Sequence, residues 1–422
     1  MLVLSCGTCA TNAPDGSECM PCASCGDVLN VTYDRGLTLP RDARVVFRSR
    51  LTSHALHERS GVWRFRELLP PVNDSQIVTL QEGNAPELPA ERSAAWSGLE
   101  GLSVKNLGCN PTGSYKDAGM TVAVTRARVA GAKVLACAST GNTSASLAVY
   151  AARAGLPAVV LLPAGHVPTS KLAQALDAGA IALGIDGDFD VAMQAARELA
   201  LRGAVYLVNS LNPFRREGQK TVAFELLESR GWRVPDWVIV PGGNLGHCVA
   251  LAQGFAQAQA LGLAERVPRI AVVQAAGAAP FVRAWQQNEP LVPVHATTFA
   301  TAIKIGNPVS WRPALRALHA TGGTAIAIED DRIAEARAVL ARDGLACEPA
   351  SAATLAGALA LRERGTIDEA ADVVALLTGS SLKDVASIER YHGDPSKTLA
   401  NPLRRVAGDM ASLERAIAEA LR

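Results

Sequence analysis

From about Lys133 to the region of Thr378, short β-branched runs alternate with alanine-rich stretches of helical periodicity. This alternation is typical of a parallel sheet whose strands are connected by covering helices. The strands that it predicts are Val134–Ser139, Ala158–Leu162, Ile181–Ile185, Val205–Asn209, Trp237–Val240, Ile270–Gln274 and Asp372–Thr378. The helices that it predicts are Thr143–Ala154, Ser170–Ala178, Phe189–Arg202, Gly218–Ser229, one that begins at Cys248, and a last helix, Ala411–Arg422, packed on the surface. We therefore expect an α/β protein, and 422 residues are enough for two such domains and a small appendage.

Glycine and small polar residues follow several of the predicted strands. The loop after Trp237–Val240 reads Gly242-Gly-Asn-Leu-Gly-His247 and leads into a predicted helix. Open α/β sheets bind ligands at the carboxyl ends of their strands, so the functional site is expected there. The backbone N–H groups of such a loop, together with a helix N-terminus, are suited to binding an anion. Taken alone, a glycine loop between a strand and a helix is also compatible with a simple tight turn.

Lys116 lies in the segment Asn110-Pro-Thr-Gly-Ser-Tyr-Lys-Asp117, after a Pro/Gly turn and before a helical run. At that place its side chain can face a cleft, where desolvation lowers the pKa of an amine toward neutrality. A partly neutral amine is what an aldehyde cofactor requires for covalent capture. For a lysine considered by itself, an exposed side chain beside a turn is the simpler interpretation, so the hypothesis depends on the neighbouring motifs.

Read together, a series of short segments resembles the threonine synthases, a branch of the fold type II pyridoxal 5'-phosphate (PLP) enzymes. The segments are Asn110-Pro-Thr-Gly-Ser-Tyr-Lys-Asp117, Ala138-Ser-Thr-Gly-Asn-Thr-Ser-Ala-Ser146, Asn209-Ser-Leu-Asn-Pro-Phe-Arg215, Glu217-Gly-Gln-Lys-Thr221, Gln274-Ala-Ala-Gly-Ala-Ala-Pro280, Ala302-Ile-Lys-Ile-Gly-Asn-Pro308, Glu348-Pro-Ala-Ser-Ala-Ala353 and Leu377-Thr-Gly-Ser-Ser-Leu-Lys-Asp384. Each is short, but they occur in the order of that family, so together they are specific.

The resemblance implies a tryptophan synthase β-like architecture of two three-layer α/β domains with parallel-rich sheets. It implies a small domain at about 109–207, a large PLP-binding domain at 31–108 plus 208–422, and a zinc-ribbon-like segment at 1–30. It also implies a homodimer. Closure of the small domain over the substrate would exclude water until the reaction needs it.

The same resemblance implies how PLP is held. Lys116 is the catalytic residue and holds the cofactor as a Schiff base, Asn142 bonds the phenolic oxygen, and Thr378 partners the pyridine nitrogen. The phosphate of PLP lies in the loop formed by Gly243, Asn244, Leu245, Gly246 and His247. A threonine hydroxyl does not demand a protonated ring, which fits β and γ chemistry better than transamination. Without its context, Thr378 is an ordinary threonine at the end of a strand.

The reaction that the resemblance implies belongs to threonine biosynthesis: O-phosphohomoserine and water are converted to L-threonine and phosphate by a PLP-dependent carbon–oxygen lyase. Lys116 then acts as general acid and base at the α and β carbons. The residues that match the family's substrate-binding positions are Ser139, Thr140, Thr143, Asn209, Ser210 and Arg215. The Arg215 guanidinium suits bidentate binding of the substrate phosphate. Because Arg216 follows it, a solvated pair of charges at a helix start is the alternative.

The match to the family has gaps. Lys116-Asp-Ala-Gly119 stands where Lys-Asp-Arg-Gly is usual, Gly83-Asn-Ala-Pro-Glu87 replaces Gly-Asn-Thr-Pro-Leu, and His247 replaces an asparagine. These changes affect the substrate assignment more than the PLP chemistry. The alternative is therefore a divergent paralogue that catalyses β-replacement or elimination on another O-phospho or O-acyl amino acid, similar to cysteate synthase.

Cysteines are concentrated at the start of the chain. Cys6-Gly-Thr-Cys9 and Cys22-Ala-Ser-Cys25 are two Cys-x-x-Cys pairs, a spacing that binds tetrahedral Zn²⁺. Cys19 offers an alternative pair with Cys22, a rubredoxin-type iron site uses the same ligands, and free reduced thiols are the simplest alternative. Four thiolates leave zinc no open position, so the role of such a site is structural or interfacial rather than catalytic.

Charge and composition exclude several classes of partner. Lysine plus arginine number 41 against 40 acidic residues, a net charge of +1, so no global field attracts nucleic acid or an anionic membrane. Residues 1–30 contain no lysine or arginine, which disfavours a nucleic-acid-binding zinc ribbon. The sequence has no membrane-spanning run and no recognisable signal peptide. We expect a cytoplasmic enzyme of a small-molecule phosphoamino acid, with neither nucleic acid nor membrane as a partner.

Overall fold

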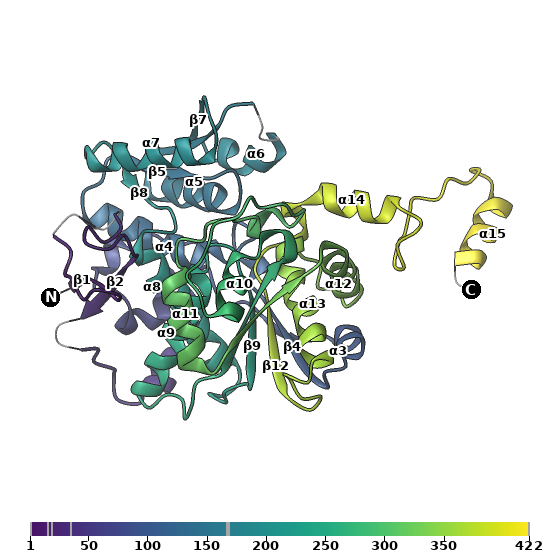
Figure 1. Ribbon diagram of the computed structural model, residues 1–422, viewed down its shortest axis with the longest axis horizontal. Helices are drawn as coiled ribbons and strands as arrows, with labels where there is room; N and C mark the ends of the chain where they lie inside the picture. The colour runs from purple at the N-terminus through teal and green to yellow at the C-terminus, as the bar shows by residue number, and fades with distance from the viewer. Residues whose placement is uncertain (1, 15–16, 18–19, 34–35, 166–168, 421–422) are drawn as a thin grey trace.

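The computed structural model describes residues 2–14, 17, 20–33, 36–165 and 169–420. Two α/β sheets dominate this part of the chain (Figure 1). The smaller sheet is wholly parallel, in the order β7-β6-β5-β8, with strands β5 (Leu135–Ala138), β6 (Ala158–Pro163), β7 (Ile181–Ile185) and β8 (Tyr206–Leu207). The larger sheet has the order β11-β10-β9-β12-β4-β3, with strands β3 (Glu87–Pro89), β4 (Gly101–Asn106), β9 (Trp237–Pro241), β10 (Arg269–Ala275), β11 (Thr324–Ile328) and β12 (Asp372–Leu377). Only β3 is antiparallel to its neighbour there.

Helices connect and cover these strands. The longer ones are α4 (Lys116–Val129), α5 (Asn142–Ala154), α6 (Thr169–Asp177), α7 (Phe189–Leu201), α8 (Pro213–Ser229), α9 (Gly246–Ala260), α10 (Pro280–Gln287), α11 (Trp311–Thr321), α12 (Asp330–Arg342), α13 (Pro349–Glu363), α14 (Val385–Gly393) and α15 (Met410–Ala420). The shorter ones are α1 (Ala43–Ser49), α2 (Leu56–Arg59), α3 (Glu91–Ser97) and single 3₁₀ turns at Arg50–Thr52, Trp63–Leu68, Asp74–Gln76, Leu107–Cys109, Ala276–Ala278, Thr301–Ile303 and Ser381–Lys383.

Each main sheet forms the middle of three layers. In the larger sheet, α13 packs on β9 to β12 from one face, with α3 and α12 beside it, while α9 and α11 pack against β10 from the other face. In the smaller sheet, α5 packs on β5 and β6, and α7 contacts β5, β6 and β8. Because parallel crossovers are right-handed, the return from β7 to β8 carries α7 over the face opposite to α5 and α6. The predicted α/β class with parallel-rich sheets is therefore confirmed.

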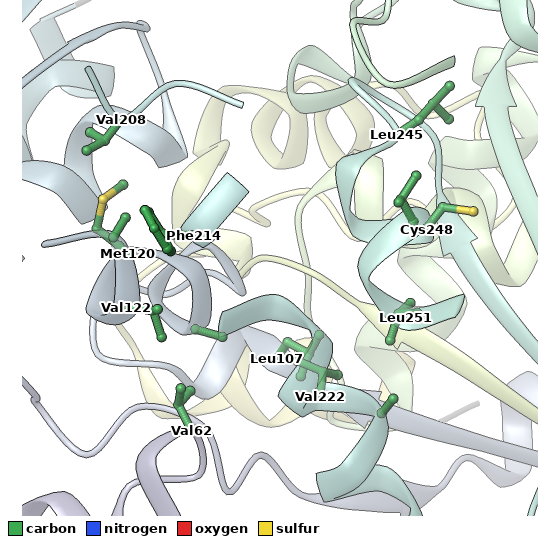
Figure 2. Close-up of a cluster of buried hydrophobic side chains, with 14 of the residues drawn as sticks. Val62, Leu107, Met120, Val122, Val208, Phe214, Val222, Leu245, Cys248 and Leu251 are labelled. Atoms are coloured by element: carbon green, nitrogen blue, oxygen red, sulfur yellow. The ribbon is translucent and has the colours of Figure 1, made fainter. Parts of the chain in front are cut away.

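Three helices form the core between the two sheets. α8 packs closely against α4 and α9, and apolar side chains from all three meet around Met120, Phe214, Val222 and Leu251 (Figure 2). Two glycines allow the close approach of α4 and α8. A Cβ at Gly218 would lie 1.9 Å from the carbonyl oxygen of Ala118, and one at Gly119 would lie 2.6 Å from that of Arg215. The glycines of two sequence motifs therefore bring the lysine segment and the arginine segment together.

The predicted elements are present with shifted ends. The helix predicted from Gly218 begins at Pro213, because Asn212 Oδ1 accepts a hydrogen bond from Phe214 N at 3.0 Å and proline occupies the first turn. The helix predicted from Cys248 begins at Gly246, and the strand Val205–Asn209 is reduced to two residues. The sequence pattern did not predict β3, β4, β11 or the helices around them.

The prediction that the last helix packs on the surface is wrong. α15 has no buried residue, Met410 and Ile417 are 69% and 59% exposed, and the helix lies apart from the body at the end of an extended segment (Figure 1). Its Arg422 end falls outside the described residues. No helix in the described ranges is both long and apolar enough to cross a membrane.

The N-terminal segment forms a small unit of its own, which we call the cysteine head (residues 2–33). Its strands β1 (Leu2–Cys6) and β2 (Leu29–Tyr33) pair antiparallel, with Cys6 opposite Leu29. β2 packs against α8, so the head lies on the core helix rather than on a sheet.

Candidate active site

Chain segments far apart in sequence meet at the carboxyl ends of the strands. An isolated bridge pairs Ser114 with Gly379, and another pairs Cys347 with Ser380. Tyr115 N also donates to Thr378 O at 3.0 Å. These contacts join the lysine loop, the end of β12 and the start of α13, and the site is built around them.

Lys116 is the first residue of α4, and the loop before it is rigidly held. Buried Asp117 accepts hydrogen bonds from Thr112 N at 2.7 Å, Thr112 Oγ1 at 2.6 Å and Ser146 Oγ at 2.6 Å. The Lys116 amine contacts the Tyr115 hydroxyl and lies 3.7 Å from the centre of the Tyr115 ring. Desolvation, aided by the nearby Arg215 charge, lowers the pKa of Lys116 to about 7. The amine is therefore partly neutral at physiological pH.

Asn142 is the first residue of α5. Its Nδ2 donates to Glu348 Oε2 at 3.0 Å. Glu348 is buried, and burial raises the pKa of its carboxyl group, while the neighbouring Lys116 opposes this shift. The Glu348 carboxylate also lies where a Cβ of residue 379 would be, 2.4 Å away, so only glycine fits at that position. Glu348 thus orients Asn142 and balances the charge of the lysine.

The loop between β9 and α9 has the features of an anion cradle. Leu245 adopts a left-handed conformation with φ +66°, and the N–H groups of Gly243 to His247 form no hydrogen bond with any described residue. Ser310 Oγ, buried and without a partner among the described residues, lies 3.8 Å from where a Cβ of Gly246 would be. Free N–H groups at a helix N-terminus, with an unpaired hydroxyl beside them, match what a phosphate group requires.

His247 takes part in this site in a way that the sequence did not predict. Its ring packs on the Tyr115 ring with centroids 4.2 Å apart, and neither ring nitrogen has a partner among the described residues. Burial, aided by the Lys116 charge, lowers the pKa of His247 to about 3. The imidazole is therefore neutral and packs against Tyr115, and both its backbone N–H and its one ring N–H lack a partner among the described residues.

Thr378 directly follows β12 as a buried hydroxyl, and Ser351 of α13 lies against it. The two Oγ atoms are 3.1 Å apart, and Ser351 Oγ accepts from Thr378 N at 2.8 Å and Gly379 N at 3.0 Å. The site thus presents two neutral hydroxyl groups where the sequence predicted one. Neither Ser351 nor Glu348 was assigned a role from sequence, although both lie in the segment Glu348-Pro-Ala-Ser-Ala-Ala353. The spacing from a helix-starting Glu-Pro to a serine was the available signal.

Arg215 lies on α8 and is buried. Its Nη1 donates to Val208 O at 3.2 Å, while Nε has no partner among the described residues. The Arg215 carbonyl lies against Gly119 of α4, one turn after Lys116, and the guanidinium charge helps desolvation to lower the pKa of Lys116. Arg216 is buried as well and bonds to the cysteine head. The alternative of a solvated charge pair is therefore wrong.

The other predicted substrate residues lie along the ends of β5 and β8. Asn209 bridges the two strands, since its side chain accepts from Ala138 N at 2.9 Å and donates to Ala138 O at 2.8 Å. Its amide is thus engaged in holding the sheet. Ser139 Oγ accepts from Gly141 N at 3.3 Å and shapes the loop before α5. Thr140, Thr143 and Ser210 are partly exposed in the same region.

The four cysteines of the two Cys-x-x-Cys pairs converge in the head. Their sulfur atoms all lie within 4.8 Å of one another, with Cys6 Sγ and Cys25 Sγ 3.4 Å apart and Cys9 Sγ and Cys22 Sγ 3.5 Å apart. Each pair is followed by a left-handed residue, Ala10 at φ 57° and Gly26 at φ 73°. Zinc–sulfur bonds of about 2.3 Å in a tetrahedron put the sulfurs about 3.8 Å apart, close to the observed spacing. Cys19 lies outside the described residues.

Comparison with known proteins identifies the family. The sequence profile of the pyridoxal-phosphate dependent enzymes matches residues 78–379. The chain belongs to this family. Threonine synthase of Methanocaldococcus jannaschii is 42% identical over 402 residues, which cover 94% of this chain and 97% of that protein. Threonine synthase of Synechocystis sp. is 45% identical over 352 residues, 83% of this chain and 90% of that protein. Within the family the chain therefore groups with the threonine synthases.

Solved structures agree on the fold. Threonine synthase from Escherichia coli superposes with a TM-score of 0.67 at 18% identity and covers 96% of both chains. Threonine deaminase from Solanum lycopersicum superposes with a TM-score of 0.62 at 19% identity, over 91% of this chain and 90% of that one. The fold type II architecture expected from the motifs is confirmed.

Proposed function

We propose that the protein is a threonine synthase, which converts O-phosphohomoserine and water to L-threonine and phosphate with the help of PLP. The observation that carries this proposal is one desolvated lysine amine in a structure that also offers two separate groups suited to anions. The glycine loop suits the phosphate of the cofactor, and buried Arg215 suits the phosphate of the substrate. An enzyme for a phosphorylated amino acid that uses PLP needs two such sites.

The residues present fit PLP. Lys116 supplies the amine, and Gly243 to His247 and Ser310 supply donors for a phosphate. Asn142 is held by Glu348, and Thr378 with Ser351 offers hydroxyl groups to a ring nitrogen. When bound, PLP supplies an aldehyde that condenses with amines and a ring system that delocalises electrons from the substrate carbons.

The chain's own residues account for binding and proton transfer. The Lys116 amine moves protons at the α and β carbons of the substrate, which its pKa near 7 allows in both directions. Arg215 holds the γ-phosphate while its carbon–oxygen bond breaks and free phosphate leaves. The oxygen of water then forms the new bond at the β carbon. The proton lost from the β carbon ends on the γ carbon, which becomes the methyl group, and the proton released by water leaves with phosphate. Neutral His247 and Tyr115 line the amine and limit the access of water to it.

We also propose that residues 109–207 act as a small domain that closes over the substrate against a large domain of residues 31–108 plus 208–422. The smaller sheet lies wholly in the first range and the larger sheet wholly in the second. The loop that carries Asn142 and the predicted substrate residues Ser139, Thr140 and Thr143 would move with the small domain.

The cysteine head is proposed to hold one structural zinc ion through Cys6, Cys9, Cys22 and Cys25. The convergence and spacing of the sulfurs support this, and iron in a rubredoxin-type site uses the same ligands. Metal analysis of freshly reduced protein should return about one equivalent, and Cys22→Ser should lose it. Cys109→Ser, which changes an exposed cysteine outside the cluster, should retain it.

We also propose a cellular compartment and an oligomeric state for the enzyme. The eight described cysteines are all free thiols, which supports a reducing compartment such as the cytoplasm. A homodimer is proposed as well, and the exposed apolar side chains of α15 support association with a second copy. Light scattering of the purified enzyme should return twice the mass of the chain.

A substrate screen tests the activity. Purified enzyme loaded with PLP is incubated with O-phosphohomoserine, O-phosphoserine or O-acetyl amino acids, and phosphate and amino-acid products are measured. We expect threonine and phosphate in equal amounts from O-phosphohomoserine. Turnover of only three-carbon substrates would instead identify a β-replacement or elimination enzyme.

A further inference from the structure

The two arginines at the start of α8 serve different neighbours. Arg215 packs against α4, the helix that begins with Lys116, and donates to Val208 O, whereas Arg216 donates to Leu29 O and, at 3.1 Å, to Asn30 Oδ1 of the cysteine head. Consecutive helical residues point about 100° apart, so one residue can anchor the helix while the next binds a ligand. Arg216, the next residue in the chain, therefore anchors the turn of α8 that carries Arg215.

A second contact holds the same turn of α8. Tyr33 at the end of β2 donates its hydroxyl to Glu217 Oε2 at 2.5 Å, and Lys220 Nζ donates to the same oxygen at 2.6 Å. Glu217 and Lys220 are buried and Tyr33 is half-buried, so water has only limited access to this contact. Residues 216 and 217 are thus both tied to β2, directly after the arginine that faces the site.

The cysteine cluster controls where β2 begins. Cys22 N donates to Asp27 O at 2.8 Å, Cys6 pairs with Leu29, and Leu29 supplies the carbonyl that Arg216 binds. On the far side of the head, Arg316 of α11 donates to Thr8 Oγ1 at 2.9 Å and lies 3.4 Å from Asp27 Oδ2. So small a unit has little apolar core of its own, and its shape depends on the four sulfurs being held together.

We propose that Arg216 and the Tyr33–Glu217 pair are positioning residues, through which the metal-loaded cysteine head sets the orientation of Arg215 toward the substrate phosphate. The inference rests on the proposed function, because it requires Arg215 to bind phosphate. It assigns the head a role in substrate affinity beyond the stability of the fold. Loss of the head's metal then weakens phosphate binding without removing the cofactor.

The test measures binding of inorganic phosphate by calorimetry to full-length, PLP-loaded enzyme, whose cofactor cradle is already filled. Tyr33→Phe and Arg216→Gln should each weaken phosphate binding and raise KM by roughly tenfold or more, since small misplacements of binding groups have effects of this order. The kcat, the bound metal and the cofactor absorbance should change little. Arg316→Gln is the matched control, because it removes a guanidinium contact of the head with α11 and not with α8.

Chelation of the metal should weaken phosphate binding of the wild type to the level of Arg216→Gln and add little to that variant. Arg215→Ala distinguishes failure of the positioning role from failure of the proposed phosphate site. If Arg215→Ala weakens phosphate binding but Tyr33→Phe, Arg216→Gln and chelation do not, the phosphate site stands and the positioning role is overturned. If Arg215→Ala has no effect either, the proposed substrate site is wrong and this inference falls with it.

Discussion

At the scale of single residues, the chemistry depends on how far burial shifts the pKa of ordinary side chains. Lys116 is a common residue at the start of a helix, and its loss of solvent together with the Arg215 charge makes its amine reactive. Burial and the Lys116 charge lower the pKa of His247 as well. Arg215 is thus the buried positive charge that acts on the lysine, and an anion is expected there.

The shifted pKa of Lys116 predicts a pH dependence for capture of the cofactor. A neutral amine attacks an aldehyde, and a pKa lowered to about 7 makes the neutral fraction rise through that pH. The rate of PLP incorporation into enzyme stripped of cofactor should therefore increase from pH 6 to pH 8 and level off above it, which stopped-flow absorbance measures. A rate that still rises steeply toward pH 10 would show that the amine is not desolvated.

The hydroxyl pair predicts different effects for its two members. Ser351→Ala leaves the N–H groups of Thr378 and Gly379 without their buried acceptor, so the free energy of unfolding should fall by about 1–3 kcal/mol. Thr378→Val retains those contacts and the shape of the side chain, so it should weaken PLP binding with a smaller effect on stability. Urea unfolding of cofactor-free protein and PLP titration give the two quantities. Equal loss of stability in both variants would contradict this division.

At the scale of elements, α8 shows why the sequence pattern predicted the wrong start for a helix, Gly218 in place of Pro213. Residues from Pro213 to Glu228 are all buried, although many are charged, so the helix has no polar face for periodicity to reveal. Its charges are paired inside the protein: Arg64 with Glu228, Lys105 with Glu225 and Lys220 with Glu217. The first two of these partners come from distant segments and cannot be deduced from the helix alone.

Loss of one partner of a buried ion pair should reduce the stability of the fold much more than loss of one partner of an exposed pair. Lys105 Nζ lies 2.7 Å from Glu225 Oε1 and donates to Ala85 O, and it is fully buried. Lys105→Met should destabilise the fold by about 3–5 kcal/mol, since it leaves a buried carboxylate without its partner. Lys397→Met removes a pair with exposed Asp331 and should change stability far less, because solvent screens that pair. Urea unfolding compares the two variants, and similar losses in both would show that the buried pair contributes no more stability than the exposed one.

At the scale of the whole molecule, the site lies where two sheets and the helices between them meet. The lysine and the cradle belong to segments that pack on the central helices, whereas Asn142 follows a strand of the smaller sheet. Lys383, beyond β12, bonds to Gln174 of α6 and so links the two units across the site. Binding of a ligand between them should draw the units together.

Hydrogen exchange measures this closure. Phosphate bound to the PLP-loaded enzyme should slow amide exchange in the loop at residues 139–142 and at the start of α5, because those amides lose contact with water on closure. Peptides from α15 are an internal control, since that helix lies apart from the body. Unchanged exchange at 139–142 with phosphate bound would show that the open arrangement already binds the ligand.

The sequence by itself determined the α/β class and the strands from β5 to β10, and it predicted Lys116 as the cofactor lysine and the glycine loop as its phosphate site. These features depend on local rules: strand and helix periodicity, and the need for glycine and free N–H groups near a phosphate. The order of the motifs along the chain, through their resemblance to one enzyme family, also related Asn142, Thr378 and Arg215 to that lysine.

Only the tertiary structure decided which groups act together. Glu348 meets Asn142 across 206 positions of the chain, and Tyr33 meets Glu217 across 184. It also showed that Arg215 and Arg216 are both buried and serve separate partners. The physical reason is that burial and the pairing of charges are properties of packed surfaces, which bring together residues whose separation in sequence carries no information about their contact.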